Sequence, residues 1–187
     1  MDEVGRGALA GPLVLAAVLV DDAKDFESLT SGFILRDSKK MTRMQRQVAF
    51  ENLVKIVDRF EIEIIDVEFI NKYGISKANS LGFLNLANKI RADKYIVDGN
   101  ISWQKENMIS VVKADNFLKP VMAASVIAKI TRDAIMGDLK KDFPEFGFEK
   151  HVGYGTLCHI EAIKKYGLTK HHRHLFVRNI ISKAAAN

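Results

Sequence analysis

Two adjacent acids, Asp2 and Glu3, stand near the start of the chain, and a glycine-flanked arginine, Gly5-Arg6-Gly7, follows after one residue. Carboxylate oxygens are the ligands that Mg²⁺ and Mn²⁺ prefer in proteins. Glycines have no side chains to hold a ligand away, so a phosphodiester can come close to the backbone of this loop. Together, the two features predict a protein that binds a nucleic acid strand and cuts it with divalent metal ions.

Two further acids, Asp98 and Asp115, each follow a short apolar run that we expect to be a strand. In open α/β sheets, ligand-binding groups gather at the carboxyl ends of strands. We therefore expect both acids to meet Asp2 and Glu3 at one rim, where clustered carboxylates repel each other unless cations offset their charge. This arrangement predicts two Mg²⁺ or Mn²⁺ ions that clamp a phosphodiester when the substrate is bound.

Each of these acids, taken alone, has a simpler interpretation. Asp98 precedes a glycine and would serve as an ordinary turn residue, and Asp115 would serve as a helix cap or a loop residue. The combination of both with Asp2, Glu3 and the Gly-Arg-Gly loop (residues 5–7) favours the metal-binding interpretation.

The bulk properties fit one globular domain with a polyanionic partner. The chain has 187 residues, of which 48% are hydrophobic and 27% charged. Its net charge of +5 favours a nucleic acid partner without requiring one. A single cysteine, Cys158, excludes an internal disulfide, and we expect it to be a core residue in a reducing compartment. The apolar run 13–20 is too short to span a bilayer and has no basic leader, so we expect a cytoplasmic protein without a membrane association.

The hydrophobic pattern predicts an α/β domain with a mixed sheet. The run 12–20 is typical of a strand buried on both faces. A capping box of Thr42 and Gln45 predicts a helix over 42–59, and apolar residues follow at near-helical spacing, namely Met44, Val48, Leu53, Val57 and Phe60. Further strands are expected over 61–67, 94–99 and 108–113, and further helices over 76–92, about 121–141, 156–166 and from Phe176.

Several other residues are candidates for contact with the substrate or for support of the site. Ser38 and Lys39 suit phosphate contact, although a solvated basic turn is an equal alternative. In the 121–141 helix, Lys129 and Asp133 share a face with Ser125, and their spacing alone predicts only a surface ion pair; the family resemblance described below implies that this face turns toward the site and that they support it rather than bind metal. The basic cluster 170–174 lacks the ligand spacing of a zinc site, which leaves phosphate contact or packing for Arg173.

The order and spacing of these motifs resemble the type 2 ribonuclease H family (ribonuclease HII). The matching segments cover nearly the whole chain and are residues 2–7, 9–14, 37–40, 95–99, 113–115, 124–129, 131–133, 151–156 and 172–173 with Phe176. The chain departs from the family pattern at Leu175, where the family usually has serine. Only Met1 precedes Asp2, which predicts a short first strand with the charged amino terminus beside this acid.

The resemblance implies an α/β fold with an RNase H-like mixed β-sheet flanked by helices. It implies a single catalytic domain over 1–187, in which about 150–187 form a small C-terminal helical extension. It further implies an endoribonuclease that cleaves the RNA strand of RNA–DNA hybrids and the 5′ side of ribonucleotides embedded in duplex DNA. The products would be 3′-hydroxyl and 5′-phosphate ends, and the expected partner of this monomer is nucleic acid.

By motif position, Asp2, Glu3, Asp98 and Asp115 match the catalytic, metal-binding acids of the family. Gly5, Arg6 and Gly7 match the loop that senses the ribose 2′-hydroxyl, and Tyr154 matches the tyrosine that stacks on the next, deoxy, sugar. The physics agrees, because a 2′-hydroxyl is the only local group that separates RNA from DNA. Without the resemblance, Tyr154 would be taken as a half-buried loop tyrosine.

Two alternatives for the whole protein stay open at this point. One is a nucleic-acid-binding module that has lost catalysis. The other is a type 3 ribonuclease H that lacks its N-terminal domain.

Overall fold

The computed structural model describes residues 1–21 and 24–178. These residues form two compact units, each built from three separate stretches of the chain. The first unit contains Met1–Val4, Val14–Glu63 and Ser80–Ile130, and the second contains Gly5–Leu13, Ile64–Asn79 and the described chain from Thr131. All four candidate acids belong to the first unit, whereas the Gly-Arg-Gly loop and Tyr154 belong to the second.

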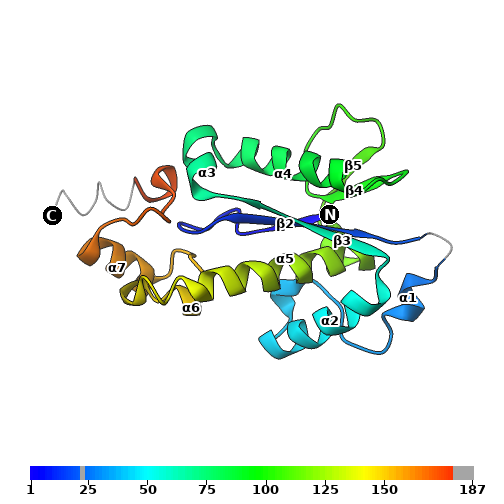
Figure 1. Ribbon diagram of the computed structural model, residues 1–187, viewed down its shortest axis with the longest axis horizontal. Coiled ribbons are helices and arrows are strands. Elements are labelled where there is room, and N and C mark those ends of the chain that lie inside the picture. Colours follow the sequence, from blue (N-terminus) through cyan, green and yellow to red (C-terminus); the bar gives the residue numbers. More distant parts are fainter. Residues whose placement is uncertain (22–23, 179–187) are drawn as a thin grey trace. The chain divides into compact units, whose positions relative to one another are not determined.

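Strands and helices alternate along the described residues, as Figure 1 shows. The strands are β1 (Asp2–Val4), β2 (Leu13–Leu19), β3 (Arg59–Ile65), β4 (Tyr95–Asp98) and β5 (Met108–Val111). The α-helices are α1 (Phe26–Leu29), α2 (Arg43–Ile56), α3 (Val67–Tyr73), α4 (Ile75–Lys89), α5 (Lys119–Asp138), α6 (Phe148–His151) and α7 (Leu157–Tyr166). Short 3₁₀ turns are η1 (Ser38–Lys40), η2 (Ala114–Asn116) and η3 (Pro144–Phe146).

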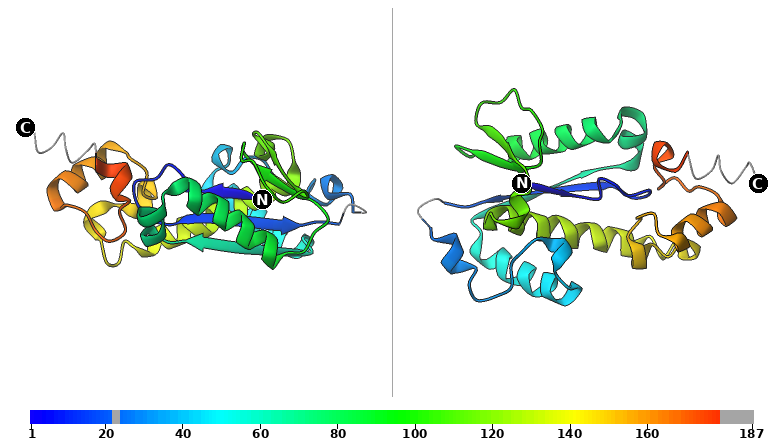
Figure 2. Two further views of the ribbon diagram at one scale, coloured as in Figure 1. Left: turned by 90° about the horizontal axis from the view of Figure 1, so that it is seen from above. Right: turned by 180° about the vertical axis from the view of Figure 1, so that it is seen from behind.

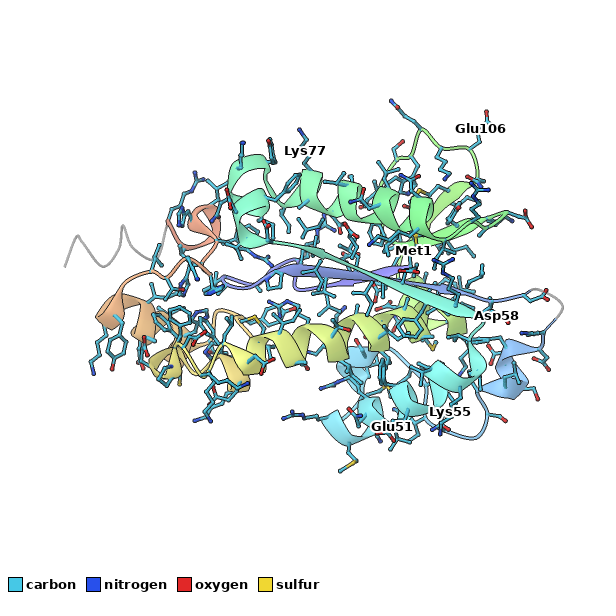
Figure 3. The ribbon with its side chains drawn as sticks, in the orientation of Figure 1. Met1, Glu51, Lys55, Asp58, Lys77 and Glu106 are labelled. Atoms are coloured by element: carbon cyan, nitrogen blue, oxygen red, sulfur yellow. The ribbon has the colours of Figure 1, made fainter. Side chains whose placement is uncertain are left out.

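Both strand directions occur, which confirms the predicted mixed sheet. The strand order β1-β2-β3 forms one sheet, in which Asp2 of β1 lies opposite Ala16 of the antiparallel β2. The parallel pair β4-β5 forms the other. Met1, labelled in Figure 3, joins the two: its amino group donates to the Ile96 carbonyl at 2.8 Å, and its carbonyl accepts from the Asp98 N–H at 3.0 Å. These bonds place the end of β4 beside the start of β1.

The predicted double burial of β2 is confirmed, and the packing of the first unit explains it. A Cβ atom at Gly82 of α4 would come within 2.4 Å of the Leu15 side chain, so helix and strand touch closely there. Val18 packs instead against a cluster that includes Leu53 of α2 and Val126 of α5. Figures 1 and 2 show α4 and α5 on opposite sides of β2. An apolar run without alternation is therefore what this strand requires.

The helix α2 confirms its predicted start, but of the apolar residues Met44, Val48 and Leu53 only Leu53 is buried. Thr42 and Gln45 form the capping box, with each side chain accepting from the other's backbone N–H. However, the buried residues are Ala49 and Leu53, whereas Met44 is 74% exposed. The outer face also carries Glu51 and Lys55, as Figure 3 shows. The helix therefore packs through the small side chain of Ala49 together with Leu53, and the apolar spacing alone did not show that Met44 and Val48 are exposed.

Other predicted elements shift by a few residues, and three short helices, α1, α3 and α6, were not predicted. The strand expected over 61–67 is β3, which begins at Arg59 and ends at Ile65. Asp66 then caps the unpredicted α3 by accepting from the Phe69 N–H at 2.7 Å. An Asp directly after an apolar strand is a helix-start signal that the sequence reading passed over.

Two further expectations concern the second unit. Cys158 is exposed in the first turn of α7, so its prediction as a core residue is wrong. The helix expected from Phe176 is confirmed over 174–178, and its continuation lies outside the described residues.

The second unit has its own apolar core. Its members come from distant parts of the sequence and are Ala10, Met136, Phe146, Phe148, Ala162, Ile163 and Val177. Within the described ranges, every helix is too short or too polar to cross a bilayer.

Candidate active site

Asp2 lies at the start of β1 and Asp98 at the end of the neighbouring β4, and backbone N–H groups fix both carboxylates. Asp2 is 4% exposed, and its Oδ1 accepts from the Glu3 N–H at 2.8 Å. Asp98 is half-buried at the end of β4, and its Oδ1 accepts from the Ala114 N–H at 2.7 Å. The bond from Ala114 also ties the β4 end to the turn that carries the next acid.

Asp115 lies in that turn, η2, and is 4% exposed. The turn begins at Lys113, whose φ of 57° is left-handed, a conformation that side chains other than glycine rarely adopt. The Asn116 side chain donates to Asp115 Oδ1 at 2.9 Å, and Lys39 Nζ lies 3.8 Å from Asp115 Oδ2. Residues held in such rare backbone conformations cluster at functional sites, so this turn is a candidate for one.

The carboxylates feel one another's charge. Burial raises the pKa of Asp2 to about 6, and the nearby charge of Asp98 acts in the same direction. Hydrogen bonds from Ser125 and from the Glu3 N–H oppose this rise. Burial also raises the pKa of Asp115, again with help from Asp98. The site therefore holds more buried negative charge than its surroundings neutralise, which favours a cation.

The donor set fits magnesium or manganese, with one qualification on geometry. Among residues 1–21 and 24–178, no three His, Cys, Asp or Glu side chains are placed to hold a single ion together. Mg²⁺ commonly uses only one or two carboxylates and completes its shell with water and substrate phosphates. Ions held by pairs of these acids and by a phosphate match that pattern. The assignment of Asp2, Glu3, Asp98 and Asp115 as ligands stays a prediction, and Glu3 is half-buried beside Asp2.

The Met1 ammonium group lies in the same neighbourhood, as the sequence predicts. Burial lowers its pKa to about 6, while the charges of Asp2, Asp98 and Glu3 act in the opposite direction. With its pKa lowered to about 6, the Met1 amino group is mostly neutral at pH 7 and offsets little of the negative charge of the acid cluster.

The turn at residues 37–40 brings a second cation to the cluster. Asp37 caps the turn by accepting from the Lys39 N–H at 3.0 Å. The Lys39 side chain is largely exposed. Partial burial lowers the pKa of Lys39, but nearby carboxylates outweigh that effect and raise it; they are Asp37, Asp2, Asp115 and Asp98. Lys39 therefore lies in the field of acids from three separate segments and keeps its charge.

Ser38 has a different environment from its neighbour Lys39. Its side chain is fully buried, and its Oγ lies 2.9 Å from Ser125 Oγ of α5. The hydroxyl that the sequence offered for phosphate contact is thus bonded inside the protein.

In the second unit, the two glycines of the Gly-Arg-Gly loop differ in their surroundings. Gly5 has a φ of 96°, and a Cβ atom there would come within 2.1 Å of Arg132 Nε. A Cβ atom on Gly7 would meet nothing within 4 Å. Arg6 between them is exposed. The fold itself requires glycine at position 5, whereas the open space at Gly7 leaves its backbone accessible.

The buried side chain of Arg173 is hydrogen-bonded to backbone carbonyl groups of this loop and of Gly11. Its guanidinium group donates to Gly11 O at 2.9 and 2.8 Å, to Gly5 O at 2.7 Å and to Arg6 O at 3.1 Å. Burial lowers the pKa of Arg173 to about 9, with a contribution from the charge of Arg132. The structure thus places Arg173 as a packed support of the loop backbone.

Arg132 of α5 is a supporting residue that the sequence reading did not single out. It is fully buried and donates to Pro12 O at 3.0 Å, Ala10 O at 3.0 Å and Val152 O at 2.7 Å. Its guanidinium carbon lies 5.5 Å from the centre of the Tyr154 ring. The sequence offered one signal for it: Arg132 follows a run of mostly apolar residues, 121–128, on the same helix, and all of these are buried in the structure.

Tyr154 belongs to a loop that is bonded to the loop at residues 8–11. Leu9 and Ala10 both donate their N–H groups to Gly153 O, at 2.9 and 3.2 Å. A Cβ atom on Gly153 would come within 2.3 Å of Ala10 O, so only glycine permits this approach. The half-buried Tyr154 and the Gly-Arg-Gly loop are therefore parts of one backbone assembly within the second unit.

A pair of buried histidines, also not predicted, supports Tyr154. His172 Nδ1 accepts from the Thr169 N–H at 2.9 Å, so the His172 proton is on Nε2, which donates to His159 Nε2 at 3.2 Å. His159 must then donate from Nδ1 to the Tyr154 carbonyl at 2.9 Å. Burial lowers the pKa of His159, and it lowers that of His172 to about 4 with help from His159. Both rings are neutral at physiological pH.

Lys129 and Asp133 follow Ser125 by one and two turns of α5 on the same face, and both are half-buried. Their supporting role stays a prediction.

Comparisons with known proteins point to one family. A family model described as Ribonuclease HII matches residues 1–179. The chain is 38% identical over 183 residues to Ribonuclease HII of Rickettsia africae (strain ESF-5), which covers 94% of this chain and 89% of the relative. It is 40% identical over 182 residues to Ribonuclease HII of Wolbachia sp. subsp. Drosophila simulans (strain wRi), with 94% and 87% covered.

The fold is also similar to a solved structure. The crystal structure of the ribonuclease H2 from Pyrococcus horikoshii OT3 superposes with a TM-score of 0.81 at 28% identity, covering 100% of this chain and 97% of that one.

Proposed function

This chain belongs to the ribonuclease HII family of phosphodiester hydrolases, and we propose that it nicks duplex DNA on the 5′ side of embedded ribonucleotides and cleaves the RNA of RNA–DNA hybrids. Water would attack phosphorus, and the bond to the 3′ oxygen would break. The products would carry 3′-hydroxyl and 5′-phosphate ends. The family match over residues 1–179 favours this function over the type 3 alternative.

One observation carries the proposal: acids from three chain segments are buried within one another's electrostatic field. A binding module without catalysis has no use for such costly charge, so the acid cluster speaks against that alternative. The absence of a protein nucleophile with an adjacent base among the motifs agrees with attack by water.

We assign the four acids to holding Mg²⁺ or Mn²⁺, two ions being expected with substrate bound. When bound, such ions lower the pKa of an attacking water and offset the charge that develops on the leaving oxygen. Asp2 and Asp98 are held by the N–H groups of Glu3 and Ala114, so they present fixed oxygens. Lys39 is placed to offer its ammonium group to a backbone phosphate.

We assign recognition of the ribonucleotide to the second unit. Arg173 occupies the Gly5 and Arg6 carbonyls, which leaves the opposite side of the loop backbone for the sugar. The open space at Gly7 suits a close approach of the 2′-hydroxyl. Tyr154, held through its carbonyl by His159, would pack on the following deoxyribose, where an added hydroxyl would clash. We propose that residues 1–187 serve as a single catalytic domain, as the family resemblance implies.

The same reasoning leads us to propose a cytoplasmic monomer whose partner is nucleic acid. Its net charge of +5 attracts the phosphate backbone, so its affinity should fall steeply as salt rises.

The test is the variant Asp98→Asn on a duplex with one ribonucleotide. Loss of the charge should abolish Mg²⁺-dependent nicking, while binding of the duplex stays within a few-fold of the wild type. Asp58→Asn removes an exposed carboxylate that pairs with Lys24 and serves as the matched control. Retained nicking by Asp98→Asn would contradict the assigned role.

A further inference from the structure

Two buried hydroxyl groups, those of Ser125 and Ser38, are connected to the Asp2 side chain by hydrogen bonds. Ser125 on α5 is 1% exposed, and Ser38 in η1 is fully buried. Their oxygens are 2.9 Å apart, and the Ser125 hydroxyl is also hydrogen-bonded to the Asp2 side chain. Three segments that are far apart in the sequence therefore meet in one chain of hydrogen bonds.

The direction of each bond in this chain follows from the chemistry of its end group. An ionised carboxylate accepts hydrogen bonds and cannot donate them, so the Ser125 O–H must donate to Asp2. That hydroxyl has no second proton, so at the Ser38 contact Ser125 can only accept. Ser38 is thus the donor to Ser125, and Ser125 the donor to Asp2. The hydrogen bonds therefore run in one direction, from Ser38 through Ser125 to Asp2, and the bond to Asp2 depends on both serines.

The first member of the chain belongs to a rigid turn. Arg46 donates to Ser38 O at 3.0 Å and to Met41 O at 2.5 Å, and Asp37 caps the same turn. The next residue, Lys39, lies 3.8 Å from Asp115. One turn therefore reaches two acids by different routes: Asp2 through two hydroxyls, and Asp115 through an ammonium group.

We propose that Ser125 and Ser38 are positioning residues that fix the Asp2 carboxylate for cation binding and tie it to the phosphate-binding turn at residues 37–40. This inference rests on the proposed function of Asp2. The hydroxyl of Ser38 acts inward on the acid cluster, and Lys39 supplies the outward contact to phosphate. A partner group that orients a metal ligand typically affects metal affinity or activity by about 10–100-fold.

The experiment measures Mn²⁺ affinity by calorimetry without nucleic acid, and kcat and KM with a duplex containing one ribonucleotide. The variants are Ser125→Ala, Ser38→Ala and the double variant. Ser125→Ala should weaken Mn²⁺ binding by about 10-fold and lower kcat, with KM nearly unchanged. Ser38→Ala should have a smaller effect, because Ser125 can still donate to Asp2.

The one-way chain makes a sharper prediction for the double variant. Once Ser125 is alanine, Ser38 has no route to Asp2, so the double variant should match Ser125→Ala within about two-fold. Thr30→Val is the matched control, because Thr30 is also a buried hydroxyl of the first unit, and it donates to the Phe26 carbonyl instead. This control should keep the Mn²⁺ affinity of the wild type.

Three outcomes would overturn the inference. Unchanged Mn²⁺ affinity in a folded Ser125→Ala or Ser38→Ala protein would exclude a positioning role. Effects that simply multiply in the double variant would show two independent residues. A wild-type protein that shows no metal-dependent nicking of the ribonucleotide duplex would overturn the proposed function as well, which distinguishes the two failures.

Discussion

At the scale of single residues, Asp2 is held in an unfavourable state. It is almost completely buried, and its pKa is raised to about 6 from an ordinary value of 3.8. The folded protein therefore binds a proton more tightly than the unfolded chain. At neutral pH, the ionised carboxylate destabilises the fold, and this penalty disappears as the pH falls through 6 towards 4.

Asp2→Asn should accordingly stabilise the metal-free protein while it abolishes nicking. Asparagine keeps the oxygen that accepts from the Glu3 N–H but carries no charge, so the variant loses the penalty of the buried carboxylate. From the raised pKa of Asp2, we expect the free energy of unfolding to rise by roughly 1–3 kcal/mol at pH 7.5. Urea unfolding in the presence of a chelator measures the gain. The difference from the wild type should shrink at pH 4.5, where Asp2 is protonated. A variant that is less stable at pH 7.5 would contradict this account of the charge.

At the scale of elements, the second unit uses buried cations and neutral rings to shape loops. The side chains of Arg173 and Arg132 donate to the carbonyls of residues 5, 6, 10, 11, 12 and 152, and His159 of the histidine pair donates to the carbonyl of Tyr154. Each loop is therefore fixed from inside, and its outer side stays available. Loops on a fixed base suit the recognition of one hydroxyl, where small displacements matter.

Alanine at the two glycines of the Gly-Arg-Gly loop should separate folding from function. Gly5→Ala should lower the free energy of unfolding by about 1–3 kcal/mol, because its φ of 96° and the contact with Arg132 exclude a side chain. Gly7→Ala should keep wild-type stability, since its Cβ atom meets nothing, yet reduce nicking if the sugar approaches there. Equal stability losses in both variants, measured by urea unfolding, would contradict this description of the loop.

The histidine pair predicts how the stability of the fold depends on pH. The pKa of His172 is lowered from 6.5 to about 4, so the unfolded chain takes up a proton in this window and the folded protein does not. Stability is therefore lost as the pH falls from 6.5 to 4, by up to roughly 3 kcal/mol.

His172→Gln removes this titration and should show a flatter pH dependence. Asp2 titrates in both proteins, so its opposite contribution cancels in the comparison. Urea unfolding at pH 7.0, 5.5 and 4.5 gives the measurement. Parallel curves for the two proteins would show that His172 is not held neutral.

At the scale of the whole molecule, the sequence predicted most of the strands and long helices and the placement of Asp98 and Asp115 at or just after the ends of strands. These features could be predicted because they depend on residues that are close together in the sequence. Examples are the capping box at Thr42, the apolar run of β2 and the Asp-Gly pair at the end of β4. Supporting contacts were beyond its reach, because Ser38 and Ser125 are 87 positions apart and meet only in the folded chain. Arg132 and the histidine pair were missed for the same reason.

The division into two units has a consequence for function. The acids lie in the first unit and the proposed ribose-sensing loop in the second, yet Val4 and Gly5 are consecutive residues. The chain thus passes directly from Asp2 and Glu3, which we propose as metal ligands, to the Gly-Arg-Gly loop, which we propose as the ribose sensor.

The most direct test of the account is cleavage of a duplex that contains one ribonucleotide, with Mg²⁺ and with a chelator. We predict a single nick on the 5′ side of the ribonucleotide, only with Mg²⁺, that leaves a 3′-hydroxyl and a 5′-phosphate. Binding of the duplex without any metal-dependent nick, or the same nick in the chelator, would contradict the claim that these acids hold ions for hydrolysis.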